Sequence, residues 1–239
     1  MPMQRFQPYK NKQRTMIMKV WLDTANLDEI REGVSWGVVR GVTTNPTHIA
    51  NAGVTNFRDH ILRIIDLVEG PVSAEVVSTD WEGMVREAEQ IARWSPHVVV
   101  KIPTIIEGLK AMKVVKTFAT INATLIFTSN QAYMAAAAGA HYVSPFINRL
   151  DVISQDGMQL VRDCVQIFKN YGWNTEVVSA SIRTVRQVQE CLLVGSQIVT
   201  MPLSILRQMM DHPLTEIGLK MFLDDWAKVA PLLAQGENA

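Results

Sequence analysis

Eight short runs of β-branched and other apolar residues recur along the chain, about 20 to 30 residues apart. They occupy residues 18–24, 38–45, 72–78, 97–103, 119–126, 141–147, 175–181 and 197–202. Between them, apolar residues at three- and four-residue spacing predict helices, for example over residues 81–94, 107–116, 130–138, 156–170 and 184–194. Regular alternation of strand and helix indicates parallel βαβ units. The sequence therefore predicts an α/β fold.

Closure of these units into one barrel is the architecture that fits best. The eight units lie within roughly 200 residues and no Gly/Ser-rich or Pro-rich linker divides them, so we expect a single (β/α)8 TIM barrel over residues 18–212. A doubly wound open sheet is the alternative, but no GxGxxG motif follows any predicted strand. Residues 213–239 are expected to add an extra C-terminal helix and a tail.

The C-terminal segment carries an apolar helical face that a barrel does not require. Its residues are Leu214, Ile217, Met221, Phe222, Trp226 and Val229. Spacing of this kind places them on one side of a helix, which then needs a partner to cover it. We therefore expect this helix to contact another subunit of an oligomer.

Charge and hydropathy argue against several classes of partner. The 23 basic and 23 acidic residues balance, but residues 1–17 carry four basic residues and no acid, so the rest of the chain is mildly acidic. We expect no nucleic-acid partner. The basic leader, interpreted as a disordered tail, lacks the apolar stretch of a secretory signal, and no run approaches the ~20 apolar residues of a membrane span. A cytoplasmic protein without a membrane partner is expected.

Residues that commonly hold metals show no ligand spacing. The five histidines are scattered, and Cys164 and Cys191 stand far apart in predicted helices. Such cysteines are interpreted as buried apolar side chains. We expect neither a metal site nor an organic cofactor.

One charged residue stands inside an otherwise apolar strand. In the run Val98-Val99-Val100-Lys101-Ile102-Pro103-Thr104, a bare ammonium would be costly. Burial favours the neutral, nucleophilic amine, which can form a Schiff base with a carbonyl. A structural lysine paired with a carboxylate in the core is the competing interpretation, and this strand alone does not decide between them.

Polar residues share one parity within several predicted strands. They are Thr43 with Asn45, Ser73 with Glu75, Asn122 with Thr124, and Ser179 with Ser181 and Arg183. Because alternate side chains of a barrel strand point inward, all of these are expected to face the interior. With Asp23 and Lys101 they cluster toward the carboxyl ends of the strands, where barrel enzymes have their active sites. This convergence favours a catalytic lysine over a structural one.

Six motifs, in the same order, resemble those of the small transaldolases, which share a barrel and a mechanism with fructose 6-phosphate aldolase. They are Leu22-Asp23-Thr24-Ala25, Gly41-Val42-Thr43-Thr44-Asn45-Pro46, Val99-Val100-Lys101-Ile102-Pro103, Ile121-Asn122-Ala123-Thr124-Leu125-Ile126-Phe127, Ser144-Pro145-Phe146-Ile147-Asn148-Arg149 and Ser179-Ala180-Ser181-Ile182-Arg183. The likeness runs from about Met18 to Val229. Two departures stand out: Ala123 is found where valine is common, and Ile105-Ile106 replaces polar residues beside Lys101.

The resemblance implies a role for each matching residue. Lys101 would be the Schiff-base lysine, Asp23 the acid/base at the sugar C4 hydroxyl, and Glu75 with Thr124 the pair that positions a catalytic water. The dihydroxyacetone pocket would be formed by Asn45 and Asn122 together with Thr43 and Ser144, and the phosphate site by Arg149, Ser181 and Arg183. Taken singly, Asp23 also fits a helix N-terminal carboxylate, Asn45-Pro46 a turn, and the arginines surface ion pairs.

The activity implied is that of a transaldolase. Such an enzyme moves a dihydroxyacetone unit from sedoheptulose 7-phosphate to glyceraldehyde 3-phosphate, within the pentose phosphate pathway, as a pentameric ring or a decamer. Glu75 and Phe146 form the transaldolase pair, because relatives that release free dihydroxyacetone carry Gln and Tyr at these positions. A fructose 6-phosphate aldolase and a non-catalytic barrel that binds sugar phosphates are the alternatives.

Overall fold

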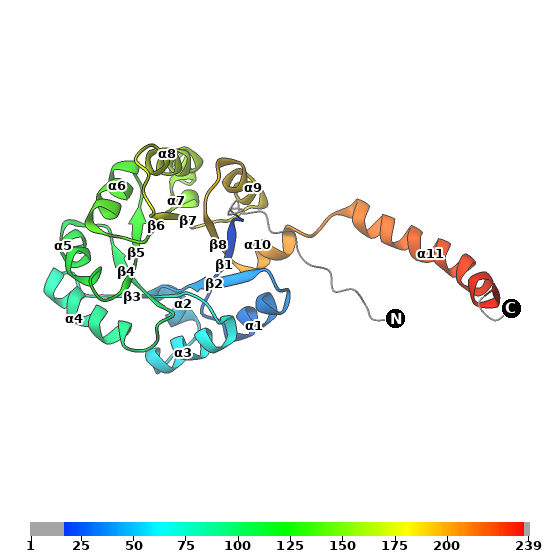
Figure 1. Ribbon diagram of the computed structural model, residues 1–239, viewed down its shortest axis with the longest axis horizontal. Helices are drawn as coiled ribbons and strands as arrows, with labels where there is room; N and C mark the ends of the chain where they lie inside the picture. The colour runs from blue at the N-terminus through cyan, green and yellow to red at the C-terminus, as the bar shows by residue number, and fades with distance from the viewer. Residues whose placement is uncertain (1–16, 237–239) are drawn as a thin grey trace, which may run out of the picture.

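All eight predicted strands form, and each pairs with its neighbours in sequence order (Figure 1). The computed structural model describes residues 17–236, so the predicted disorder of the N-terminal tail falls, apart from Ile17, outside the described residues. The strands are β1 (Lys19–Asp23), β2 (Val39–Thr43), β3 (Val72–Glu75), β4 (Val98–Pro103), β5 (Thr120–Ile126), β6 (Tyr142–Pro145), β7 (Glu176–Ser179) and β8 (Ile198–Met201). Parallel pairing of β1 with β8 closes the ring. The predicted (β/α)8 barrel is therefore confirmed.

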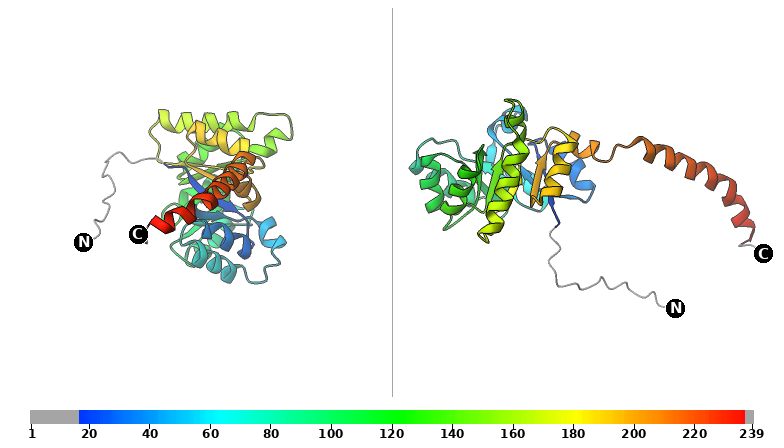
Figure 2. Two further views of the ribbon diagram at one scale, coloured as in Figure 1. Left: turned by 90° about the vertical axis from the view of Figure 1, so that its right-hand side faces the viewer. Right: turned by 90° about the horizontal axis from the view of Figure 1, so that it is seen from above.

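Helices follow the strands, and all but the last, α11, lie around the barrel (Figures 1 and 2). They are α1 (Leu27–Ser35), α2 (Pro46–Asn51), α3 (Phe57–Val68), α4 (Trp81–Ala92), α5 (Ile106–Val115), α6 (Ser129–Ala138), α7 (Ile147–Asp151), α8 (Gly157–Asn170), α9 (Val185–Val194), α10 (Leu203–Gln208) and α11 (Pro213–Gly236). Several begin at a side-chain cap, and Thr128 and Thr184 each form a reciprocal capping box with the glutamine three residues later. These caps fix where a strand's loop ends and its helix begins.

The amino-terminal end of the barrel interior is closed by an apolar cluster. Trp21, Val178 and Ile198 are buried there, Tyr142 packs against them, and we call these four residues the apolar plug. The rings of Trp21 and Tyr142 meet edge to face, with their centroids 5.4 Å apart. Gly41, the register partner of Trp21 on β2, makes room for the indole, because a Cβ at this position would lie 2.6 Å from Trp21 Cε2.

The parity prediction is wrong for Ser179 in the seventh strand. Val178 belongs to the plug, so its neighbour Ser179 points out of the barrel, where its hydroxyl lies 2.8 Å from that of Ser196. The regular strand ends at Ser179, and Ser181 has a φ of 60°, which changes the direction of the chain. Ser181 faces the carboxyl-terminal cavity because of this bend and not because of strand parity.

The predicted C-terminal helix forms as α11 and projects away from the barrel (Figures 1 and 2). Its apolar side chains are exposed, with Phe222 at 74% and Trp226 at 60% of their full accessibility. Within residues 17–236, no helix is both long enough and apolar enough to cross a bilayer.

Candidate active site

A cavity of about 290 Å³ opens at the carboxyl-terminal end of the barrel, and almost all of the predicted site residues line it. Those that do are Asp23, Thr43, Asn45, Glu75, Lys101, Thr124, Ser144, Phe146, Arg149, Ser181 and Arg183. Polar groups from separate strands therefore meet in one space, at the end of the barrel where enzymes of this fold have their active sites.

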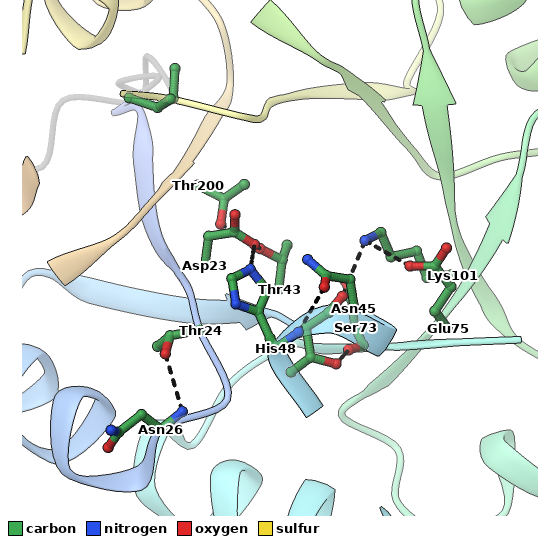
Figure 3. A network of polar contacts seen from close by, with 12 residues as sticks. Asp23, Thr24, Asn26, Thr43, Asn45, His48, Ser73, Glu75, Lys101 and Thr200 are labelled. Carbon is green, nitrogen blue, oxygen red and sulfur yellow. Dashed lines mark hydrogen bonds and ion pairs between the residues drawn. The ribbon is translucent and has the colours of Figure 1, made fainter. Parts of the chain in front are cut away.

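Lys101 reaches this cavity from the middle of β4, with only 4% of the residue exposed. Its Nζ lies 3.0 Å from Glu75 Oε2 and donates to the carbonyl oxygen of Thr44 at 3.1 Å (Figure 3). Glu75 is the register partner of Lys101 on β3, so the two side chains emerge side by side on the inner face. The lysine is thus paired with a carboxylate, as the structural interpretation expects, but the pair borders an open cavity.

Thr124 adds an unpartnered hydroxyl to the same wall. Its Oγ1 is buried and has no hydrogen-bond partner among the described residues, so its hydrogen-bonding capacity is unused in this structure. The pairing of β5 with β6 shifts in register between Ala123 and Ile126, and Leu125 has a φ of 57°, a conformation that few residues other than glycine adopt. Irregular strands of this kind are typical next to active sites, where they redirect side chains.

Asn122 is the one predicted site residue that does not line the cavity. It is fully buried one layer below, where its Nδ2 donates to Ser73 Oγ at 3.3 Å. Its Oδ1 accepts a hydrogen bond of 2.7 Å from the hydroxyl of Ser144, which does line the cavity. In this structure Asn122 holds Ser144 in place and is not itself part of the cavity wall.

Asp23, at the end of β1, is contacted by a threonine hydroxyl and a histidine ring. Its Oδ1 accepts a 2.8 Å hydrogen bond from the Thr43 hydroxyl and lies 3.4 Å from His48 Nε2 (Figure 3). Burial by itself would raise the pKa of this carboxyl, but the hydrogen bond and charge of His48, the charge of Lys101 and the Thr43 bond together hold the pKa below its usual value. The carboxylate form of Asp23 is therefore favoured.

This wall contains three polar residues that were not predicted from the sequence, Thr47, His48 and Thr200. The Thr200 hydroxyl lies 2.6 Å from that of Thr43, and both residues line the cavity. Thr200 is a polar residue within a predicted strand, so the parity argument applied to the other strands would have found it. His48 lies in the first turn of α2, beyond the strand end, where the two-residue period no longer applies.

The sequence left open whether Asn45 belongs to a turn or to the substrate pocket, and the structure gives it a place in both. It is the N-cap of α2, where its Oδ1 accepts a 2.9 Å bond from the backbone N–H of His48, and it also lines the cavity. Capping of the short helix fixes the direction in which the His48 side chain leaves the backbone.

Two arginines mark the other side of the cavity mouth. The guanidinium carbon of Arg149 lies 5.2 Å from the centroid of the Phe146 ring, a cation–π arrangement. The backbone N–H of Arg183 donates to Gln187 Oε1 at 2.8 Å, and Gln187 Nε2 donates to Asp151 Oδ2 at 2.7 Å, which ties the loop after β7 to α7. In residues 17–236 neither arginine forms an ion pair with a carboxylate, so the surface salt-bridge interpretation finds no support there.

The described part of the chain contains no group of three or more His, Cys, Asp or Glu side chains arranged to hold a metal ion. Cys164 on α8 and Cys191 on α9 are buried and form no disulfide, and burial raises the pKa of their thiols to about 12 and about 11.

Comparison with known proteins gives a consistent picture. Residues 20–233 match the family model described as Transaldolase/Fructose-6-phosphate aldolase. A protein of Petrotoga mobilis named "Probable transaldolase" is 51% identical over 222 residues, covering 92% of this chain and all of its own. One of the same name from Herpetosiphon aurantiacus is 53% identical over 213 residues, covering 89% of this chain and 96% of its own.

Among solved structures, inosine 5'-monophosphate dehydrogenase from Legionella pneumophila superposes with a TM-score of 0.53 at 15% identity. The superposition covers 77% of this chain and 58% of that one. A likeness at this identity concerns the barrel alone.

Proposed function

The chain belongs to the transaldolase/fructose-6-phosphate aldolase family, and we propose that it is a transaldolase acting through a Schiff base on Lys101. It transfers a dihydroxyacetone unit from sedoheptulose 7-phosphate to glyceraldehyde 3-phosphate, yielding erythrose 4-phosphate and fructose 6-phosphate, a step of the pentose phosphate pathway. The observation that carries the proposal is the meeting of Lys101, Glu75 and Asp23 in one cavity. Neither a metal nor an organic cofactor takes part.

Lys101 supplies the nucleophile. Glu75 Oε2, 3.0 Å from Nζ, can accept the proton whose loss frees the amine's electron pair. The neutral amine adds to the C2 carbonyl of the ketose, and the resulting carbinolamine loses water to give an iminium. Glu75 and Thr124 both line the cavity that Lys101 reaches, and the Thr124 hydroxyl has no partner among the described residues, so the pair is suited to hold the water that carries these protons.

Asp23 then acts as the base in bond cleavage. Its carboxylate takes the proton of the C4 hydroxyl, the C3–C4 bond breaks, and its electron pair flows into the iminium to form an enamine. An aldose phosphate leaves, and the three-carbon enamine remains on Lys101 until an acceptor aldehyde arrives. Bond formation runs the same steps in reverse, with Asp23 returning the proton.

Arg149, Ser181 and Arg183 are suited to the phosphate group. A guanidinium presents several donors to phosphate oxygens, and these two lack carboxylate partners among the described residues. The hydrogen bonds through Gln187 and Asp151 hold the loop that carries Arg183 against α7, which carries Arg149.

Transfer is favoured over release of free dihydroxyacetone because of Phe146. Release requires protonation of the enamine carbon, which a phenol aimed at the bound water would make easier, and Phe146 has no proton to give. We expect transfer to outrun release by at least about 10- to 100-fold, at or just below the low end of the ~10²- to 10⁴-fold that one positioned acid/base group contributes. The test compares glyceraldehyde 3-phosphate formation from fructose 6-phosphate with and without erythrose 4-phosphate. Equal rates in both would favour the aldolase, and Phe146→Tyr should move the balance toward release.

Borohydride reduction in the presence of fructose 6-phosphate tests the covalent step. Mass spectrometry should find a three-carbon adduct on Lys101. An adduct on another lysine of an active enzyme would refute the assignment, and the absence of both adduct and turnover would favour the non-catalytic barrel.

Exposed apolar side chains on α11 support a second element of the proposal, a homo-oligomer. A second copy would cover residues such as Phe222 and Trp226, in a pentameric ring or a pair of rings. Light scattering at micromolar concentration should give a mass several times that of one chain. A monomer would refute the homo-oligomer but not the proposed reaction.

A further inference from the structure

His48 reaches Asp23 from outside the strands. It lies in the first turn of α2, is half-buried, and lines the cavity together with the carboxylate it approaches. The cap that Asn45 makes to the backbone N–H of His48 fixes this turn, and Figure 3 shows the imidazole directed at Asp23. The start of α2 therefore holds the His48 side chain beside Asp23 in the cavity.

Donors converge on one oxygen of Asp23. The Thr43 hydroxyl has a single proton, which it donates to Oδ1, so the hydroxyl of Thr200 must be the donor in its 2.6 Å bond to Thr43. His48 Nε2 approaches the same Oδ1 at 3.4 Å. Neither Thr43 nor His48 uses Oδ2, which leaves that oxygen to face a substrate hydroxyl.

We propose that His48 is a positioning residue that keeps the Asp23 carboxylate ionised and turned so that Oδ2 meets the substrate. This inference rests on the proposed role of Asp23 as the base that cleaves the C3–C4 bond. His48 acts through Asp23 and not on the reacting carbons. The Thr200 hydroxyl donates to Thr43 and Thr43 donates to Asp23 from one side, while the His48 ring nitrogen lies 3.4 Å from the same carboxylate on the other side.

The charged groups around the imidazole are compatible with this role. Asp23 and Glu75 supply negative charge to the cavity wall, while Lys101, Arg149 and Arg183 supply positive charge from other elements. A neutral imidazole would still offer an N–H to Oδ1, and a protonated one would add its charge. In either state His48 favours the carboxylate over the carboxylic acid.

Two amide variants of different length provide the test. His48→Gln keeps an N–H donor that can reach Asp23, whereas His48→Asn places its donor too far back along the side chain. His97→Gln is the matched control, because His97 is exposed just before β4, at the opposite end of the barrel. The kcat, the KM for fructose 6-phosphate and the pH profile of kcat/KM are measured for each, with erythrose 4-phosphate as acceptor.

For His48→Asn we expect kcat to fall about 10-fold, the low end for loss of a hydrogen bond to a charged group, with KM changed by less than about 2-fold. The acid limb of the profile should move to higher pH, since losing the donor raises the pKa of Asp23 and the base is protonated sooner. His48→Gln should lie closer to the wild type in both respects, and His97→Gln should match it.

Borohydride trapping separates this inference from the function on which it rests. Schiff-base formation does not use His48, so Lys101 should be trapped in every variant, but slower cleavage in His48→Asn should raise the ratio of six-carbon to three-carbon adducts. An unmoved acid limb and an unchanged adduct ratio in a folded His48→Asn would overturn the role of His48. If His48→Asn fails to fold, His48→Leu takes its place, and an unmoved acid limb in that variant would likewise overturn the role of His48. Failure to trap the wild type would instead overturn the Schiff-base mechanism.

Discussion

The two ends of the barrel interior are built from the same strands but from opposite kinds of residue. At the amino-terminal end the apolar plug contains Trp21 and Ile198, while two residues further along β1 the chain presents Asp23 to a polar cavity. The period of two along a strand gives both residues the same inward direction. Residue type at each level then decides whether the layer supplies packing or chemistry.

The energetic balance differs between these layers accordingly. Burying a tryptophan removes roughly 150–250 Å² from water, worth about 25 cal/mol for each Å² of apolar surface. The buried Lys101–Glu75 pair offers no comparable gain, because the cost of removing two charges from water offsets their attraction. We therefore expect the apolar plug to stabilise the fold. The polar residues of the carboxyl-terminal cavity, which we call the mouth, should instead contribute to catalysis.

Removal of the lysine should give the largest effect at the mouth. Lys101→Met should lower kcat/KM by at least about 10⁴-fold, because within residues 17–236 Lys101 is the only lysine that lines the cavity and could form the covalent intermediate. Steady-state assays and borohydride trapping check this, with circular dichroism to establish that the variant is folded. Lys110→Met is the control, since Lys110 is an exposed lysine paired with Glu107 on α5, and it should retain activity. Comparable losses in both would contradict the assignment.

At the other end, Trp21→Ala should act on stability. Truncation of a buried tryptophan should lower the free energy of unfolding by about 3–5 kcal/mol, measured by urea titration. Well below the unfolding transition, kcat should stay within a few-fold of the wild type. Trp36→Ala, at a residue that is 37% exposed, should cost clearly less. A loss of activity without a loss of stability would contradict the assignment of the plug to stability and of the mouth to catalysis.

Within the mouth, the arginines should show a smaller and more selective effect. Arg149→Ala or Arg183→Ala should lower kcat/KM for phosphorylated donors by about 10- to 100-fold, because each removes hydrogen bonds to a charged group. Unphosphorylated acceptors should be affected much less. Arg186→Ala, an exposed residue paired with Glu190 on α9, serves as the control. Equal losses for both substrate types would indicate a structural role for Arg149 and Arg183.

The smallest effect is expected outside both ends, in the layer between strands and helices. Because burial raises the pKa of Cys164 to about 12 and of Cys191 to about 11, thiolate should be scarce at pH 8. Iodoacetamide should label the native protein very slowly, leave its activity unchanged, and label both thiols after denaturation. Fast labelling of the native state would show that this layer opens.

Periodicity explains why the strands and most of the site could be predicted from sequence. Inward parity identified Thr43, Glu75 and Thr124, since β-strand geometry extends to the ends of these strands. Parity failed at Ser179, where the strand ends and the chain bends through Ser181. It could not detect His48, which enters from a helix.

Parity also could not predict how deep in the barrel interior an inward-facing residue lies. Asn122 faces inward as predicted, but it lies one layer too deep to line the cavity. Whether an inward residue reaches the surface of a cavity depends on strand tilt and on the size of its neighbours, which the order of residues does not give.

The seam between β1 and β8 has a consequence for how the chain acquires activity during folding. Every other pairing joins strands that follow one another, whereas this one brings together residues such as Lys19 and Ile198 from opposite ends of the barrel sequence. Pairing strands so far apart in the sequence closes a long loop, which costs conformational entropy. We therefore expect β1 and β8 to pair late in folding. The bond between Thr43 and Thr200 then forms only when β8 docks, so the donors around Asp23 are incomplete in any intermediate with an open ring. We expect the recovery of turnover during refolding to follow ring closure, after most of the helical signal has returned.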